Sequence, residues 1–145
     1  MPHLTLPTTN DFAIVDLSVD VTRARSKALQ AANHGLPKPL KIRGLIDTGA
    51  SGTAIDRDIV KLLGLQPTGV LSIHTPSTAS QAHRCHTYDV SLRVDHPAAN
   101  ETFDPIVAVE SDLAAHGFQA LIGCNVLKKC IFIYDGEAAT FSLAF

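Results

Sequence analysis

Apolar and polar residues alternate with a period of two along much of the chain, and this pattern constrains the fold more than any other feature. Between Ala13 and Val21 every odd position is apolar, and three of the four even positions are polar. The segment Tyr88–Val94 repeats the pattern. Because successive strand residues point to opposite faces, the alternation predicts strands with one buried face. Other strand-length apolar segments are Leu40–Ile46, Val70–Ile73, Ile106–Val109, Ile131–Tyr134 and the alternating end Phe141–Phe145.

Helical patterns are short and few. Asp56 can cap a helix of about two turns, which Gly64 would end. Ser26–Asn33 and Gly123–Lys129 are two further candidates. Many short strands separated by turns indicate a mostly-β barrel or sandwich. A chain of 145 residues fits one domain, so we expect a single domain over residues 1–145.

Composition and charge exclude several classes of protein. The net charge of −2 provides no basic surface for nucleic acid. No apolar run reaches the roughly 18 residues that a membrane-spanning helix needs. The first residues lack the features of a signal peptide, and the three cysteines contain no Cys-x-x-Cys pair. We therefore expect a cytoplasmic protein with no nucleic-acid or membrane partner.

The segment Gly44–Ser51 carries the most chemical information. An apolar strand runs into Asp47, and Gly49 then permits a close turn that a side chain would block. This arrangement places one carboxylate at a rigid strand end among backbone N–H groups, where it can act as an acid or a base. A plain polar turn is an open alternative. A phosphate-binding loop is not, because Ala50 stands where that loop needs a lysine.

Three segments resemble a known family. Leu45–Ser51 resembles the active-site motif of the retropepsins, which are aspartic proteases of the retroviral type. Tyr88-Asp89 opens an alternating strand like the one that leaves the retropepsin flap, and Ala120–Leu127 is similar to the apolar-apolar-Gly segment and short helix near the retropepsin C-terminus. The resemblance covers about residues 40–145. It implies a mostly-β, retropepsin-like acid-protease barrel with one or two short helices and one lobe per chain.

The resemblance also implies an activity, with named residues in named roles. The chain would be an aspartic endopeptidase acting on peptide or protein substrates without a cofactor. It holds one Asp-Thr-Gly and is too short for two lobes, so a homodimer should supply two copies of Asp47. Thr48 would form hydrogen bonds across the dimer axis, and Gly49 would accept a substrate N–H beside Ala50 and Ser51. The alternative is a peptide-binding module of the same fold that cleaves little or nothing.

A hairpin flap is expected over residues 71–92, closing over the substrate. Its tip should lie near Pro76–Ser80, where Ser77, Thr78 and Ala79 should contact the substrate. Retroviral flaps are glycine-rich at the tip, whereas this segment has no glycine. That difference favours the binding-module alternative.

A second difference concerns a pair of positions. Ser51 and Cys124 stand where retroviral enzymes carry an acidic residue and an arginine that form an ion pair. Losing both partners leaves no lone buried charge, so the loss is tolerable. These differences, with the short helix expected after Asp56, favour a cellular, bacterial-style member of the family over a viral one.

Histidines and a cysteine gather in the second strand of the expected flap. His83, Cys85 and His86 lie close in sequence, and His74 is nearby. Imidazole and thiolate are good zinc ligands. However, residues three apart on a strand point to opposite faces, and no Cys-x-x-Cys or His-Glu-x-x-His accompanies them. We expect a polar hairpin surface here and no metal site.

The last six residues, Thr140–Phe145, are apolar at alternating positions. An edge strand of this kind left open would invite association. We expect two copies of this tail to interleave across a dimer. The alternative is an ordinary last strand within one subunit.

Overall fold

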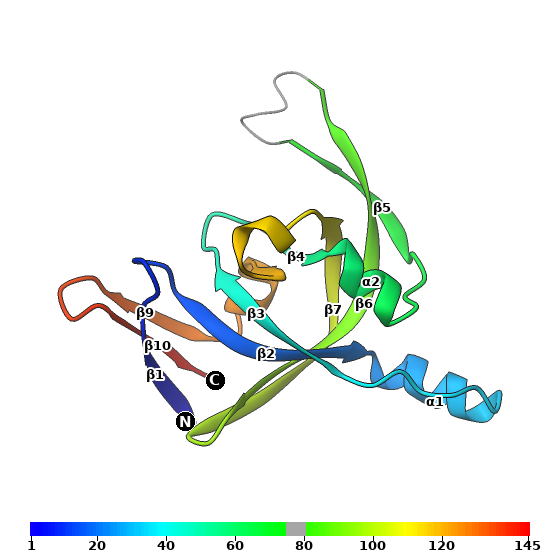
Figure 1. Cartoon of the computed structure of the whole chain (residues 1–145), viewed down its shortest axis with the longest axis horizontal. Helices are drawn as coiled ribbons and strands as arrows, with labels where there is room; N and C mark the ends of the chain where they lie inside the picture. Colours follow the sequence, from blue (N-terminus) through cyan, green and yellow to red (C-terminus); the bar gives the residue numbers. More distant parts are fainter. Residues whose placement is uncertain (75–80) are drawn as a thin grey trace.

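The computed structural model describes residues 1–74 and 81–145, and strands dominate it (Figure 1). The prediction of a mostly-β fold with few short helices is confirmed. In chain order the elements are β1 (His3–Pro7), β2 (Ile14–Val21), α1 (Arg23–Ala31), β3 (Leu40–Ile46), β4 (Thr53–Asp56), α2 (Arg57–Leu62), β5 (Gly69–Ile73), β6 (His83–His96), β7 (Ala99–Ser111), the 3-10 turn η2 (Ala114–His116), β8 (Ala120–Ile122), α3 (Cys124–Leu127), β9 (Ile131–Asp135) and β10 (Thr140–Ala144).

Six strands close into a barrel. Their order is β2-β3-β8-β4-β7-β6, and β6 pairs back onto β2. The alternation read from the sequence sets the inside of this barrel: Val15, Leu17, Val19 and Val21 of β2 are all buried, while Asp16 between them is exposed. The pairs β3–β8 and β4–β7 are parallel, which brings the ends of β3 and β8 to the same rim.

A long hairpin leaves this barrel at one end (Figure 1). β5 pairs only with the first part of β6, from Ile73 opposite His83 to Gly69 opposite Thr87. Beyond Thr87, β6 turns into the barrel and pairs with β7 and β2. The hairpin expected over residues 71–92 is therefore present. Its expected tip, with Ser77, Thr78 and Ala79, lies outside the described residues.

The helices cover little of the core. Asp56 accepts a hydrogen bond from the Asp58 N–H and begins α2, and Gly64 follows the helix with a φ of +60°, as the sequence predicts. Helix α1 begins at Arg23, three residues before the predicted start, because Thr22 caps it directly after β2 by accepting from the Arg25 N–H. In residues 1–74 and 81–145, no helix has the length and apolar character needed to cross a bilayer.

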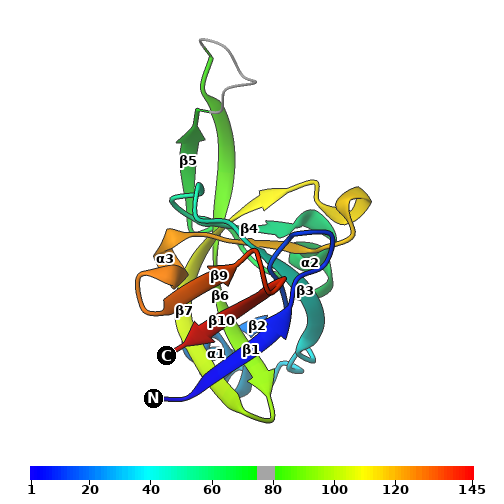
Figure 2. The same ribbon diagram turned by 90° about the vertical axis from the view of Figure 1, so that its left-hand side faces the viewer.

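The two chain ends form a separate sheet against the barrel (Figure 2). Its order is β1-β10-β9, so the C-terminal strand lies in the middle and is paired on both sides within one chain. Phe141 and Leu143 are buried there, and Phe145 packs edge-to-face on Phe103 of β7 at 5.9 Å between ring centroids. The expectation that the tail interleaves across a dimer is therefore wrong.

The cause of that error is the N-terminal strand. Residues 136–139 form a turn that returns the chain beside β9, and β1 then occupies the remaining edge of β10. Leu4, which is 1% exposed, fixes β1 in this position. A five-residue strand with two buried side chains at most gives too short an alternation for the sequence to predict it.

Candidate active site

Asp47 stands at the rim of the barrel, directly after β3. Its backbone N–H donates to the carbonyl of Ile122 at the end of β8 at 3.0 Å, which ties the two parallel strands together at this point. The chain then turns, with the Ala50 N–H donating to the Asp47 carbonyl at 3.2 Å. Within that turn the Gly49 N–H donates to Oδ1 of Asp47 at 2.9 Å. The half-buried carboxylate is thus held in one orientation by its own turn.

Helix α3 supports the turn from below. The backbone N–H groups of Cys124 and Asn125 donate to the carbonyls of Ala50 and Ser51 at 2.8 and 3.2 Å. The thiol of Cys124 lies 3.5 Å from the Thr48 carbonyl. Ser51 and Cys124 therefore come together, as the resemblance implies, and backbone hydrogen bonds join their two segments where retroviral enzymes have an ion pair.

A buried threonine connects the same two segments. The Thr53 hydroxyl, in a residue that is 1% exposed, donates to Oδ1 of Asn125 at 2.7 Å and accepts from the Gly123 N–H at 3.2 Å. Nδ2 of Asn125 donates in turn to the Val107 carbonyl at 2.8 Å. The sequence analysis did not identify either side chain. The one available signal was a polar residue in each of two otherwise apolar segments.

A cleft of about 680 Å³ lies between the Asp47 turn and the hairpin. Asp47, Gly49, Ala50 and Ser51 line it, as predicted, whereas Thr48 is exposed and is not part of the lining. The sequence analysis missed much of the rest, which reaches the cleft from three other elements. These residues are Gly52, Ala54, Arg57, Leu71, Ile73, His74, His83, Cys85, Val109, Glu110, Ser111, Asp112 and Leu121.

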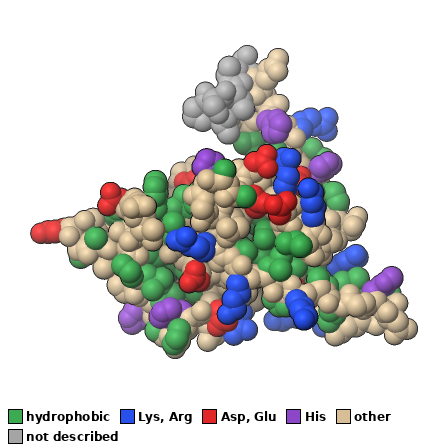
Figure 3. All heavy atoms as spheres, in the orientation of Figure 1, with side chains coloured by type: hydrophobic (Ala, Val, Ile, Leu, Met, Phe, Trp, Pro, Cys, Tyr) green, Lys and Arg blue, Asp and Glu red, His purple; other side chains and the backbone are tan. Residues whose placement is uncertain are grey.

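Charged groups stand at one end of this cleft. Figure 3 shows acidic, basic and histidine side chains gathered where the hairpin leaves the barrel. Nε of Arg57 lies 3.1 Å from Oδ1 of Asp112, and both side chains are more than half exposed. An ion pair so exposed adds little stability, so its main effect is on the shape and charge of the rim.

Asp56 fixes this rim from inside the protein. Its carboxylate is 2% exposed and accepts from the N–H groups of Asp58, Leu113 and Ala114 at 2.8–2.9 Å. Burial by itself would raise the pKa of Asp56. The three backbone donors and the Arg57 charge outweigh that effect, so the pKa falls below the ordinary 3.8. The ionised carboxylate joins α2 to the segment after β7.

The histidines divide between the two faces of the hairpin. His83 and Cys85 line the cleft with His74, whereas His86 is not part of its lining. This division follows the alternation of side chains along a strand. In the two described ranges, no group of three or more His, Cys, Asp or Glu side chains is arranged to hold a metal ion.

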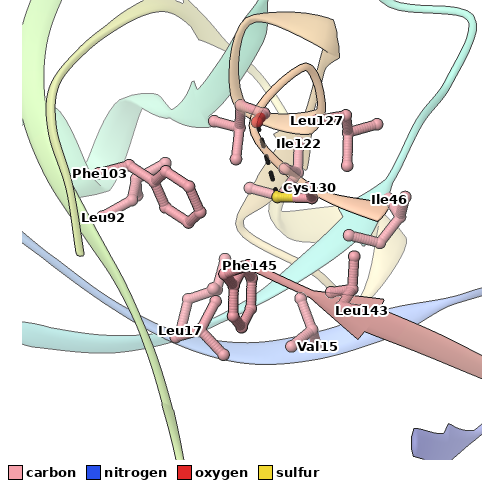
Figure 4. Close-up of a pocket in the computed structure, with 12 residues that line it drawn as sticks. Val15, Leu17, Ile46, Leu92, Phe103, Ile122, Leu127, Cys130, Leu143 and Phe145 are labelled. Atoms are coloured by element: carbon pink, nitrogen blue, oxygen red, sulfur yellow. Dashed lines mark hydrogen bonds between the residues drawn. The ribbon is translucent and has the colours of Figure 1, made fainter. Parts of the chain in front are cut away.

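A second cavity lies between the barrel, α3 and β10, but it is unsuited to a substrate (Figure 4). Its volume of about 20 Å³ holds roughly one water molecule, and its lining is almost entirely apolar. Cys130 points into it and bonds weakly to the Val126 carbonyl. Burial, aided by Glu101 and opposed by Lys129, raises the pKa of Cys130 to about 11, so this thiol is protonated at neutral pH. The cleft at Asp47 is the candidate active site.

A closed barrel with an aspartate at the end of β3, a glycine turn after it and a hairpin over it defines a retropepsin-like aspartic protease fold. Sequence comparison agrees: the family described as aspartyl protease matches residues 30–126, about two thirds of the chain. The chain belongs to this family, and the prediction of a retropepsin-like member is confirmed. No curated protein sequence matches the chain.

Solved structures show a similar fold. A retropepsin-like aspartic protease from Rickettsia conorii superposes with a TM-score of 0.58 at 18% identity, covering 97% of this chain and 89% of its own. The retroviral protease-like domain of Ddi1 from Leishmania major gives a TM-score of 0.43 at 10% identity, with 86% and 83% covered.

Proposed function

We propose that the protein is an aspartic endopeptidase that hydrolyses peptide bonds with two Asp47 carboxyl groups, one from each subunit of a homodimer. The observation that supports this most is the position of Asp47. Its carboxylate is held by the Gly49 N–H at 2.9 Å and faces a cleft of about 680 Å³. Family membership supports a protease-like function for this site.

The need for a second copy comes from the chemistry. One carboxyl group cannot be base and acid in the same step, and this chain has one Asp-Thr-Gly. Two carboxyl groups about 3 Å apart share one proton, because both cannot ionise together. The pair also defines the place of the attacking water, which is held between them.

The steps balance without a covalent intermediate. The ionised carboxylate takes a proton from the water as its oxygen bonds to the peptide carbonyl carbon. The neutral carboxyl group gives its proton to the carbonyl oxygen, forming a tetrahedral diol. The C–N bond then breaks as one carboxyl group protonates the leaving nitrogen and a diol hydroxyl returns its proton to the other. The dyad ends with the single proton it held at the start.

Substrate contacts follow from the lining of the cleft. Gly49, Ala50 and Ser51 form its floor beside Asp47. An extended peptide there would lie between this floor and the hairpin, with its N–H groups near the carbonyl of Gly49. The β5–β6 hairpin would act as the flap that excludes water, with Ser77, Thr78 and Ala79 as its contacts. Thr48, exposed in one chain, would meet its counterpart across the dimer axis.

A binding module of the same fold is the second candidate. The glycine-free segment Pro76–Ser80 favours it, since a stiffer tip would hinder closure. The decisive experiment incubates the protein with a mixture of peptides at mildly acid pH and identifies the cut sites by mass spectrometry. Cuts made by the native protein and lost in Asp47→Asn support the protease. Peptide binding with no cut supports the module.

A further inference from the structure

Strand β9 is an open, apolar edge of the terminal sheet. In the described part of the chain β9 pairs with β10 alone, so its other edge has N–H and C=O groups without a strand partner. Its side chains Ile131, Ile133 and Tyr134 are 51%, 58% and 45% exposed. The strand contains no lysine and no proline, the residues that usually protect an edge from pairing. Such an edge is suited to a further strand.

The opposite edge of the same sheet is different. Strand β1 ends in Pro7, and the carbonyl of Pro2 just before it already accepts from the Phe145 N–H. Proline has no N–H to donate and is typical of a protected edge. Of the two edges of this sheet, β9 is therefore the one open to pairing.

The exposed apolar surface continues from β9 to the active site. Phe12 is 56% exposed. The carbonyl of its neighbour Asp11 accepts from the Tyr134 hydroxyl at 2.7 Å, and the carbonyl of Ala13 accepts from the N–H of Ile46, the residue before Asp47. Phe12 thus lies between β9 and the Asp47 turn. We call Phe12, Ile131, Ile133 and Tyr134 the β9 patch.

The start of β9 is also linked to the Asp47 turn. Helix α3 contacts this turn through Cys124 and leads within a few residues to Ile131. Figure 2 shows β9 as the strand of the terminal sheet nearest α3. The β9 patch therefore adjoins the active-site turn from two directions, through Phe12 and through α3.

We propose that a second copy of the chain docks on the β9 patch, with β9 pairing antiparallel to the partner's β9 about a two-fold axis. This inference rests on the proposed function, in which the site is incomplete without a second Asp47. The pairing joins two three-stranded sheets into one of six strands and uses the same patch on both copies, as a two-fold axis requires. Both Asp47 turns then border one interface.

The test measures association in solution. Sedimentation velocity from nanomolar to high micromolar concentration compares the native protein with Ile133→Lys, and with Ile131→Glu as a second variant. Leu62→Lys is the matched control, because Leu62 is 67% exposed on α2, away from the patch. Circular dichroism checks that each variant is folded, which is expected since both β9 positions are exposed.

The native protein and Leu62→Lys should form dimers alike. Ile133→Lys should raise the dimer Kd by at least about 100-fold, which corresponds to about 2.8 kcal/mol, since each substitution occurs twice in the interface. A native protein that is monomeric at every concentration, or a folded Ile133→Lys that associates normally, overturns the inference.

The inference and the proposed function can fail separately. Asp47→Asn should dimerise like the native protein, because it changes the carboxylate and not the patch. A protein that dimerises through the patch but cuts no peptide keeps this inference and refutes the protease. A protein that cuts peptides while Ile133→Lys associates and cuts normally refutes the interface alone.

Discussion

Gly123 lies so close to Gly52 that a Cβ atom on Gly123 would overlap the carbonyl group of Gly52. The same Cβ would lie 3.0 Å from the Ala50 carbonyl oxygen. This contact explains why a glycine is needed in the second motif and why small residues follow Asp47. Two backbones that meet without side chains between them can form the hydrogen bonds from α3 that support the active-site turn.

Gly123→Ala should therefore reduce both stability and activity. The added methyl meets backbone atoms, which cannot move aside as a flexible side chain can, so we expect a loss of about 2–3 kcal/mol in the free energy of unfolding. Denaturant titration followed by circular dichroism gives this value. Gly35→Ala is the control, since a Cβ there meets nothing within 4 Å. Equal stability for the two variants would refute the close-contact argument.

Asp47→Asn should abolish peptide hydrolysis and leave the fold intact. The amide has the size of the carboxyl group but can neither take a proton from water nor share one with a second Asp47. Hydrolysis of a labelled peptide and circular dichroism are measured side by side. Asp16→Asn, at an exposed position of β2, is the control and should retain full activity. Undiminished cleavage by a folded Asp47→Asn would exclude the aspartic mechanism.

The strands that could be predicted are those with one buried face. The segment Leu40–Ile46 was predicted residue for residue, because its alternation reflects the barrel interior directly. Strand β4 gave no such signal. All four of its residues, Thr53–Asp56, are buried, so no exposed face alternates with a core face.

The active site was predictable only where it is local in sequence. Asp47 and its turn follow from one short motif. Arg57, His83 and Asp112 reach the cleft from α2, the hairpin and the segment after β7, and only the closed barrel brings these together. The tail was misassigned for a related reason, since its two partner strands come from opposite ends of the chain.

Activity should be highest below neutral pH. The mechanism requires one shared proton on the pair of Asp47 carboxyl groups, and this proton is lost as the pH rises. The initial rate of peptide hydrolysis is measured across the acid and neutral range at constant ionic strength. Sedimentation at each pH separates loss of the dimer from loss of the proton. A rate that rises steadily into alkaline solution would contradict the shared-proton mechanism.

Asp56 should make stability depend on pH in the acid range. Its pKa is lower in the folded protein than the ordinary 3.8, so it stabilises the fold fully above that pH, and the contribution is lost as the pH falls through the folded pKa. Asp56→Asn should cost about 2–3 kcal/mol at neutral pH, because hydrogen bonds to a buried charge are lost.

The difference between Asp56→Asn and the native protein should shrink as the pH falls below about 4, since the native carboxyl group is then neutral too. Urea titration at several pH values measures it. Asp58→Asn, exposed on the same helix, is the control and should show much less change. A difference that is constant from neutral to strongly acid pH would mean that the charge of Asp56 is not what stabilises the rim.

Removing the C-terminal strand should unfold the protein rather than release folded monomers. Strand β10 is the centre of the terminal sheet, and Phe141 is 1% exposed. Phe141→Ala should already cost about 3–5 kcal/mol in the free energy of unfolding, because it leaves a cavity in a packed interior. Deletion of Thr140–Phe145 should leave β1 and β9 unpaired and abolish the cooperative thermal transition. Ile133→Ala, exposed on β9, should change the stability of the monomer little. These effects should not depend on protein concentration when measured well below the dimer Kd. A truncated chain with a normal cooperative transition would show that β10 is not needed to complete the fold.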